Sequence, residues 1–307
     1  MPSVEELRPI TLQSCEYKIL AKIFTKRIPS ILDSVIEPWQ HCAVPRRKIQ
    51  TPLMNTISTI EYANQKNIDA YFLSMDILIA YDRTHVGYIL QIMKRMGYTP
   101  HTLEILELLL QGCKTTIQAF DGIIQGLRQG CLLSDPLFML NMEPLIRKLP
   151  SMTTGIQIGG LRQAVEGFMD GVNVFSTRRS DLPKIDDTFK KYELSCTLLS
   201  WTKKTKILGL SRWKEEVTWE LPWVQPVKQL RVLGIQVARE TTVTYQLSCD
   251  IVIKNVKTVI QQWISRKNIS LAGKVIITNM LILAKVWYTG QIIPIQQDIV
   301  YQIKKQV

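Results

Sequence analysis

Apolar and polar residues alternate along this chain with two different spacings. Residues 17–36 carry apolar side chains every three or four positions with lysines between them, which predicts a helix interrupted at Pro29. Residues 70–75 form a short apolar and aromatic run, which predicts a strand. The same criteria predict further helices at 52–65, 85–96, 102–111, 135–147, 182–192 and from 245 to the end, and further strands at 113–120, 155–158, 168–176, 206–210 and 232–237.

The order of these elements predicts the fold class. Strands and helices are mixed up to about residue 238, without regular strand–helix alternation, and the rest of the chain is helical. This order predicts an α+β fold in which helices cover one side of a sheet.

Composition narrows the class of protein. With 46% hydrophobic and 21% charged residues, the 307-residue chain is globular rather than disordered. Its 38 Lys and Arg against 26 Asp and Glu give a net charge of +12. Such an excess favours a polyanionic partner, nucleic acid or an anionic membrane surface, although a merely basic soluble protein remains an alternative. Because polar residues break the longest apolar run, 275–286, we expect no membrane-spanning segment.

Cysteine and histidine usage bears on metal chemistry and compartment. The six cysteines show no C-x-x-C spacing and the chain has three histidines, which argues against a zinc site. No signal peptide is visible, so we expect reduced thiols in an intracellular protein, nuclear or cytoplasmic.

Two aspartates stand inside apolar runs. Asp76 ends the run 70–76, and Asp170 lies within 167–175. A carboxylate in an apolar strand is costly unless it is paired. If the two segments are adjacent in a sheet, the carboxylates repel each other and a divalent cation relieves the repulsion. This pattern indicates metal-assisted chemistry on phosphates, whereas Asp76 alone could equally be a turn or capping residue.

Several ordered motifs resemble the reverse-transcriptase domain of non-LTR (LINE-type) retrotransposons, most closely the TX1-type branch. The most specific block is 126–138, GLRQGCLLSDPLF, which resembles the family's G-V-R-Q-G-C-P-L-S-P-L-L-F. Further blocks in the family's order are 8–12 (RPITL), 17–22 (YKILAK), 44–47 (VPRR), 75–83 around Asp76, 168–175 (FMDGVNVF), 233–235 (LGI) and 263–274 (WISRKNISLAGK).

The resemblance implies a right-hand polymerase. Residues 1–238 would form the fingers and palm, with an antiparallel sheet covered by helices, and residues 239–307 a helical thumb. The implied activity is RNA-directed DNA synthesis by two-metal nucleotidyl transfer, with Mg²⁺, or Mn²⁺ in its place, as the cofactor. The implied partners are an RNA template, a DNA primer or RNA–DNA hybrid, and deoxynucleoside triphosphates, with no membrane.

The resemblance also assigns site residues. Asp76 and Asp170 would be the catalytic metal ligands. Lys203 would neutralise or protonate the leaving pyrophosphate, although a solvated basic face is an equal alternative for it. Tyr81 would lie beneath the sugar of the incoming nucleotide and exclude a ribose 2′-hydroxyl, although a half-buried core aromatic is compatible with the same position. The remaining assigned residues, each of which has an ordinary solvated loop as its alternative, are Arg47 for template or triphosphate contact and Arg128, Gln129 and Gly130 at the start of a helix.

The chain departs from the family at chemical positions. Gly171 replaces the second aspartate of the family's metal motif, which removes a negative charge and an oxygen ligand. The other departures are Leu78 and Ile79 after the first aspartate, Arg46 for a glycine, Leu132 and Asp135 for prolines, and Ser200 for an asparagine. We therefore expect a truncated, partly degenerate copy with weak or absent activity. The alternative is a non-catalytic nucleic-acid-binding remnant or the product of a degenerate element.

Overall fold

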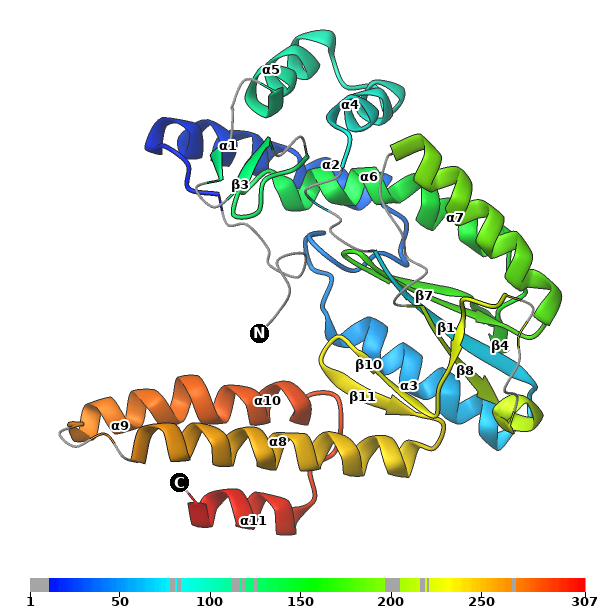
Figure 1. Ribbon diagram of the computed structural model, residues 1–307, viewed down its shortest axis with the longest axis vertical. Coiled ribbons are helices and arrows are strands. Elements are labelled where there is room, and N and C mark those ends of the chain that lie inside the picture. Colours follow the sequence, from blue (N-terminus) through cyan, green and yellow to red (C-terminus); the bar gives the residue numbers. More distant parts are fainter. Residues whose placement is uncertain are drawn as a thin grey trace.

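The computed structural model describes residues 11–77, 81, 84–111, 116–117, 120–123, 126–196, 205–215, 219, 221–264, 266 and 269–306. A central sheet lies between two groups of helices, and the last quarter of the chain forms a separate helical region (Figure 1). The helices are α1 (Cys15–Arg27), α2 (Pro29–Val35), α3 (Gln50–Gln65), α4 (Val86–Arg95), α5 (Pro100–Gln111), α6 (Ser134–Lys148), α7 (Leu182–Cys196), α8 (Thr241–Ile264), α9 (Leu271–Ile277), α10 (Ala284–Gly290) and α11 (Gln297–Gln306). The strands are β1 (Ala70–Asp76), β2 (Thr116–Ile117), β3 (Phe120–Ile123), β4 (Ile156–Ile158), β5 (Leu161–Gln163), β6 (Val165–Phe168), β7 (Gly171–Ser176), β8 (Lys206–Leu210), β9 (Gln225–Pro226), β10 (Gln229–Val232) and β11 (Ile235–Ala238).

The main sheet has five strands in the order β6-β7-β1-β8-β9. β1 is central and antiparallel to both β7 and β8, and only the edge pair β8 and β9 is parallel. The α+β class with an antiparallel-rich sheet, predicted from the sequence, is confirmed.

Side chains of β1 alternate between two apolar cores. Tyr71, Leu73 and Met75 are buried in the core that includes α6 and α7, whereas Phe72 points into the core shared with α3 and the β10–β11 hairpin. Successive residues of a strand point to opposite faces, so a strand covered on both faces reads as a continuous apolar run. The sheet therefore has helices on both faces, and the expectation that helices cover one side is wrong because α3 packs on the second face (Figure 1).

The predicted break in the first helix is confirmed. α1 ends at Arg27 and α2 begins at Pro29, which occupies the first turn of the new helix, where its missing N–H costs nothing. Ser14 caps α1 by accepting a hydrogen bond from the Tyr17 N–H over 3.3 Å.

Three predicted strands are hairpins or parts of hairpins. The run 168–176 divides into β6 and β7 at a turn through Met169 and Asp170, and the run 232–237 divides at Leu233 and Gly234. Both turns contain a non-glycine residue with positive φ, 56° at Met169 and 45° at Leu233, beside the Asp170-Gly171 pair in the first turn and Gly234 in the second. The third run, 113–120, lies in β2 and β3 where the structure describes it.

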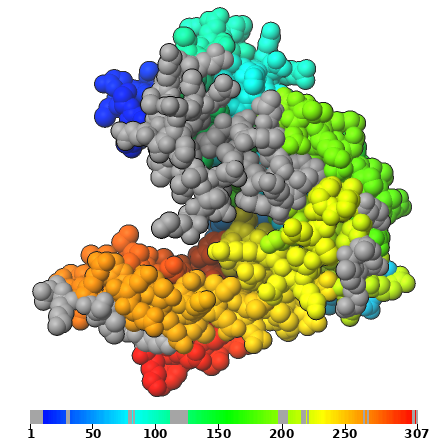
Figure 2. Space-filling view, viewed as in Figure 1, coloured from blue at the N-terminus to red at the C-terminus, as the bar shows by residue number. Residues whose placement is uncertain are grey.

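The helical region from Thr241 onward packs against the hairpin and has its own small core. Val252, Val256 and Val259 of α8 pack against Ile282. The Tyr288 hydroxyl of α10 donates a hydrogen bond to the Leu233 carbonyl at the hairpin turn. Figure 2 shows that the molecule is hollowed between α8–α10 and its N-terminal half.

One helix in the described part of the chain is long and apolar enough to cross a membrane by length and composition. It runs without a break from Leu271 to Gly290 through α9, the π-helical segment η6 (Thr278–Leu283) and α10, and 6% of its most apolar window is buried. The expectation that no segment reaches this length is therefore not met. Polar residues interrupt the stretch in the sequence, but they leave it apolar on average.

Candidate active site

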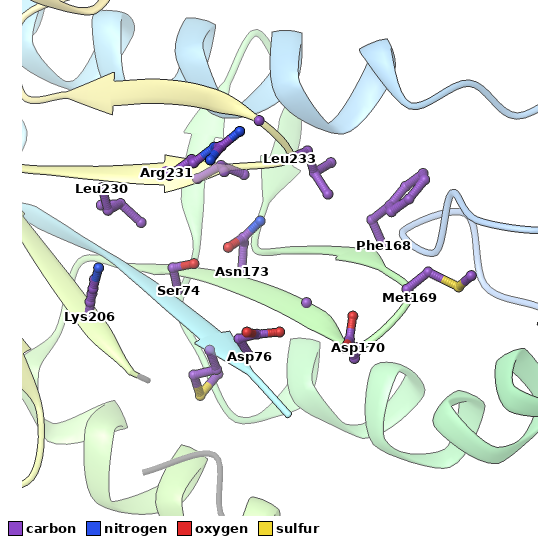
Figure 3. Close-up of a pocket in the computed structure, with 14 residues that line it drawn as sticks. Ser74, Asp76, Phe168, Met169, Asp170, Asn173, Lys206, Leu230, Arg231 and Leu233 are labelled. Carbon is purple, nitrogen blue, oxygen red and sulfur yellow. The ribbon is translucent and has the colours of Figure 1, made fainter. Parts of the chain in front are cut away.

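Asp76 and Asp170 come together where the central strand β1 ends and its neighbour β7 begins. Asp76 is the last residue of β1, and Asp170 is the second residue of the β6–β7 turn. In the β1–β7 ladder Asp76 lies opposite Gly171, the residue that follows Asp170. The Ile77 N–H donates to the Asp170 carbonyl over 3.2 Å, which ties the end of β1 to the turn. Figure 3 shows the Asp76 side chain pointing along the sheet toward Asp170.

Both aspartates line one cavity of about 680 Å³ between the sheet and the β10–β11 hairpin (Figure 3). A cavity of this size can hold a nucleotide-sized ligand. Lys206 of β8 and Arg231 of β10 also line it, so two cationic side chains share the cavity with the two carboxylates. The cavity is therefore suited to phosphate groups held between metal-binding and basic side chains.

The turn that presents Asp170 is strained at its first residue. Met169 has a φ of 56° and Asp170 does not have a positive φ, the pattern of a type II′ turn, whose first central position favours glycine. Strained backbone of this kind costs of the order of 1–3 kcal/mol and persists only where surrounding contacts hold it. Here the ladder between β6 and β7 holds the turn, and with it the place of Asp170.

A row of polar residues crosses the sheet two residues before Asp76 along β1. Lys206, Ser74 and Asn173 lie opposite one another on β8, β1 and β7, and Glu166 of β6 lies opposite Asn173. Ser74 is two residues from Asp76 and so shares its face of the sheet. Lys206, Ser74 and Asn173 line the cavity. This row was not predicted from the sequence. Its only signal in the sequence is that each of three apolar strands contains a polar residue.

Glu166, at the end of this row, is buried and fully bonded. Its carboxylate lies 2.7 Å from the His41 Nε2 and accepts a 2.7 Å hydrogen bond from the Asn55 amide. The Gln163 amide donates to the same carboxylate. This network joins the segment around His41 to β6 and α3, and supports the side of the site that carries Asp170.

Tyr81 lies beside the β6–β7 turn. Its ring stacks on Phe138 of α6 with centroids 4.7 Å apart and an interplanar angle of 17°. Its hydroxyl donates to the Asp135 Oδ1 over 3.0 Å and lies 3.3 Å from the Met169 sulfur. Burial first, and then the Asp135 charge, raise the pKa of the phenol far above its ordinary value, so the hydroxyl stays protonated. The ring is half-buried and contacts the residue next to Asp170.

Arg47 is bonded within the N-terminal half. Its guanidinium donates to the carbonyl oxygens of Glu37 (2.6 Å), Gln40 (2.7 Å) and Ile36 (2.9 Å), and pairs with Asp33 at 3.3 Å. Each of these contacts fixes the loop between α2 and α3. Arg47 therefore stabilises this loop, and it is not among the residues that line the carboxylate cavity.

The residues at the start of α6 also lie outside that lining. Arg128 is buried, stands 5.6 Å from the Tyr17 ring centroid and donates to the Leu110 carbonyl over 3.3 Å. The Gln129 carbonyl accepts from the Thr11 N–H over 2.9 Å, and Gly130 is exposed with a φ of 94°. Only glycine adopts that angle without strain. Lys203 lies outside the described residues.

The two carboxylates suit a magnesium ion whose remaining ligands come from the phosphates of a substrate and from water. Among the described residues there is no group of three His, Cys, Asp or Glu placed to hold a metal. Mg²⁺, however, is commonly held by one or two carboxylates, with phosphate oxygens and water filling its octahedron. Asp76 and Asp170 supply that number of carboxylates beside a cavity able to take phosphates.

Gly171 could carry a larger residue. Its φ is not in the left-handed region, and a Cβ built on it would lie 3.3 Å from the Phe168 carbonyl oxygen. That contact with a backbone oxygen is tight, so a side chain at this position requires the turn to shift by a few tenths of an ångström. The backbone therefore still offers the place where an aspartate would stand.

An antiparallel-rich sheet that brings Asp76 at the end of β1 next to Asp170 in the β6–β7 turn, with a helical region beside a hollow, is consistent with the right-hand polymerase fold. The chain belongs to the reverse transcriptase (RNA-dependent DNA polymerase) family, whose profile matches residues 2–237. The resemblance to this family noted in the sequence is confirmed.

A transposon protein is similar to this chain over nearly its whole length. The "Transposon TX1 uncharacterized 149 kDa protein" of Xenopus laevis is 24% identical over 323 residues, an alignment that covers 99% of this chain. The alignment covers 24% of that protein, so the chain spans about a quarter of its relative's length. The resemblance to the TX1-type branch of non-LTR elements is thus confirmed.

Two solved telomerase structures share the fold. Apo telomerase from Candida tropicalis superposes with a TM-score of 0.50 and 9% identity, covering 94% of this chain and 54% of that chain. The same telomerase in complex with a TWJ fragment of telomeric RNA gives a TM-score of 0.50 and 11% identity, covering 94% and 47%. At these identities the likeness bears on the fold alone.

Proposed function

We propose that this domain carries out RNA-directed DNA synthesis, with residues 1–238 as fingers and palm and residues 239–307 as thumb. The observation that carries the proposal is the meeting of Asp76 and Asp170 on paired strands at a nucleotide-sized cavity. The partners would be an RNA template, a DNA primer or RNA–DNA hybrid, and deoxynucleoside triphosphates.

Asp76 and Asp170 would hold Mg²⁺, or Mn²⁺ in its place. When bound, the metal activates the primer 3′-hydroxyl and stabilises the leaving pyrophosphate. The chain's own residues bind and orient around that centre. Lys206 and Arg231 would contact phosphates in the cavity, and Tyr81 would lie beneath the sugar of the incoming nucleotide. Lys203 remains a proposed cation for the leaving group.

The residues at the start of α6 and Arg47 would act mainly through the backbone they hold. Arg128 and Gln129 are bonded within the protein, so the amides of the loop, rather than these side chains, would face phosphate oxygens. Gly130 would let a nucleic-acid backbone approach closely, because it has no side chain. Arg47 would keep the neighbouring basic loop in place for the template.

Charge and shape support a nucleic-acid partner. The net charge of +12 favours a polyanion, and the telomerase that shares the fold has been solved with RNA. Exposed basic residues of the helical region would follow the phosphate backbone, namely Lys254, Lys257, Arg266, Lys274 and Lys285. The proposal needs no membrane, and it places the protein inside the cell, in the nucleus or cytoplasm.

Gly171 leads us to propose a slow enzyme. Loss of one electrostatic contact in an active site typically costs on the order of 10²–10³ in rate. The same substitution is the one specific observation in favour of the alternative, a module that binds nucleic acid without synthesis. The two functions differ in whether any nucleotide is incorporated.

Primer extension on an RNA template, with Mg²⁺ and separately with Mn²⁺, tests the proposal. We expect slow extension that Asp76→Asn and Asp170→Asn each abolish. Asp187→Asn, a change to an exposed aspartate of α7, is the matched control and should leave the rate unchanged. Template–primer binding without extension, even in a Gly171→Asp variant, would overturn synthesis in favour of the binding module.

A further inference from the structure

Asp135 makes a contact with Tyr81 that no assigned role uses. It is the second residue of α6, is exposed, and accepts the Tyr81 hydroxyl over 3.0 Å across 54 positions of sequence. The family pattern has a proline at this position, and proline cannot accept a side-chain hydrogen bond. The contact is therefore a feature of this chain.

Other contacts leave the Tyr81 ring little freedom. Phe138 stacks on one face at 4.7 Å, and the Met169 sulfur lies 3.3 Å from the hydroxyl. The Tyr81 carbonyl accepts from the Leu127 N–H over 2.7 Å and from the Thr84 N–H over 3.2 Å, which fixes the backbone. The remaining motion is a swing of the ring about its Cα–Cβ bond, and the bond to Asp135 opposes that swing.

We propose that Asp135 is a positioning residue for sugar discrimination: by holding the Tyr81 hydroxyl, it keeps the ring from yielding to a ribose 2′-hydroxyl. The proposal rests on the proposed function, in which Tyr81 lies beneath the sugar of the incoming nucleotide. Asp135 touches neither the sugar nor the metal in this role. It acts through Tyr81.

The physical reason is that a steric filter discriminates only while the blocking group stays in place. A hydrogen bond to an ionised acceptor is roughly twice as strong as one between neutral groups. Without it the ring is held only by stacking on Phe138 and by the weaker contact of its hydroxyl with the Met169 sulfur, and it can tilt to admit the larger sugar. The high pKa of the phenol fits this arrangement, because the hydroxyl remains a donor at every physiological pH.

Nucleotide-dependent stabilisation of a template–primer complex tests the proposal without requiring catalysis. The primer ends in a dideoxynucleotide, so it cannot be extended. The lifetime of the protein–template–primer complex is measured after excess unlabelled template–primer is added, in the presence of either the next correct deoxynucleotide or the matching ribonucleotide. The wild type should be stabilised by the deoxynucleotide at lower concentration. Asp135→Ala and Tyr81→Phe should each reduce that preference about tenfold, and the double variant should lose no more.

Asp135→Asn is the decisive control, because its amide oxygen can still accept the hydroxyl. It should keep a preference between those of the wild type and Asp135→Ala, because a neutral acceptor makes a weaker hydrogen bond. A loss in Asp135→Asn equal to that in Asp135→Ala would assign the effect to charge and overturn the positioning role, as would an unchanged preference in Asp135→Ala and Tyr81→Phe. If no next nucleotide stabilises the wild-type complex, the proposed function fails, and this inference fails with it.

Discussion

The two faces of the main sheet differ in what covers their side chains, a closed apolar core on one face and an open cavity on part of the other. On the α6–α7 side, β1 contributes Tyr71, Leu73 and Met75 to a closed apolar core. On the other side, the same strand passes from buried Phe72 to Ser74 and Asp76 at a cavity. The difference shows how one strand provides rigidity through one face and chemistry through the other. Substitutions on the two faces should therefore separate stability from activity.

The largest expected effect is on the core side. Leu73→Ala removes a side chain that is 1% exposed and leaves a cavity, so the free energy of unfolding should fall by about 2–5 kcal/mol. Urea denaturation followed by tryptophan fluorescence measures the loss. Ser74→Ala, the adjacent position on the other face, should change stability by less than about 1 kcal/mol. Equal losses for the two variants would contradict the division between the faces.

Next in size is the restoration of a carboxylate on the cavity side. Gly171→Asp places a third acidic group beside Asp76 and Asp170, and the backbone there accepts a Cβ with a small shift. We expect primer extension to rise by on the order of 10². Gly171→Asn, of equal size but uncharged, should give much less. A similar rise in both variants would show that size rather than charge matters.

A smaller effect concerns a buried carboxyl on the core side. Burial raises the pKa of Glu143 to about 7 despite hydrogen bonds from Arg147 and the Glu37 N–H. In the unfolded chain the carboxyl has its ordinary pKa of 4.5, so folding binds a proton between pH 4.5 and 7. Its contribution to stability is present at low pH and is lost as pH rises from about 4.5 to 7, by on the order of 1–3 kcal/mol.

Denaturation of the wild type and a Glu143→Gln variant at several pH values measures this contribution. The difference in unfolding free energy between the two proteins should change across that window and be constant above it. Glu107→Gln, at an exposed position of α5, serves as the control and should show no such change.

The smallest expected effect is on the cavity side. Lys206→Gln should weaken template–primer binding and reduce the slope of log affinity against log salt by about 1, as for one lost phosphate contact. Filter binding over a range of salt concentrations measures the slope. Lys190→Gln removes an exposed lysine of α7 that pairs with Asp186, and it should leave the slope unchanged.

The elements that depend on local pattern could be predicted from the sequence. α3, β1 and β8 lie close to the predicted ranges because apolar spacing alone defines them. The α6 helix follows in the same way from its apolar face, with Pro136 in its first turn. The pairing of β1 with β7, which brings Asp76 to Asp170, entered the sequence analysis only as a condition, because the apolar setting of both aspartates does not say which strands are neighbours.

The rest depends on contacts between distant residues, which local pattern does not encode. Met169 and Leu233 turn the chain at angles that favour glycine, so their own residue types gave no sign of the hairpins, although Gly171 and Gly234 follow close behind them. Arg47 lies in a basic loop, which is typical of a phosphate-binding site, yet its guanidinium donates to backbone carbonyls of the same protein. The hydrogen bond from Tyr81 to Asp135 joins two segments whose sequences give no sign of each other.

The contact between Tyr288 and the Leu233 carbonyl makes the hairpin an extension of the C-terminal helices. The hairpin is also one wall of the space in front of Asp76. Under the proposed function, a movement of those helices on a bound duplex would also move this wall, and would so link the hold on the duplex to access to the cavity.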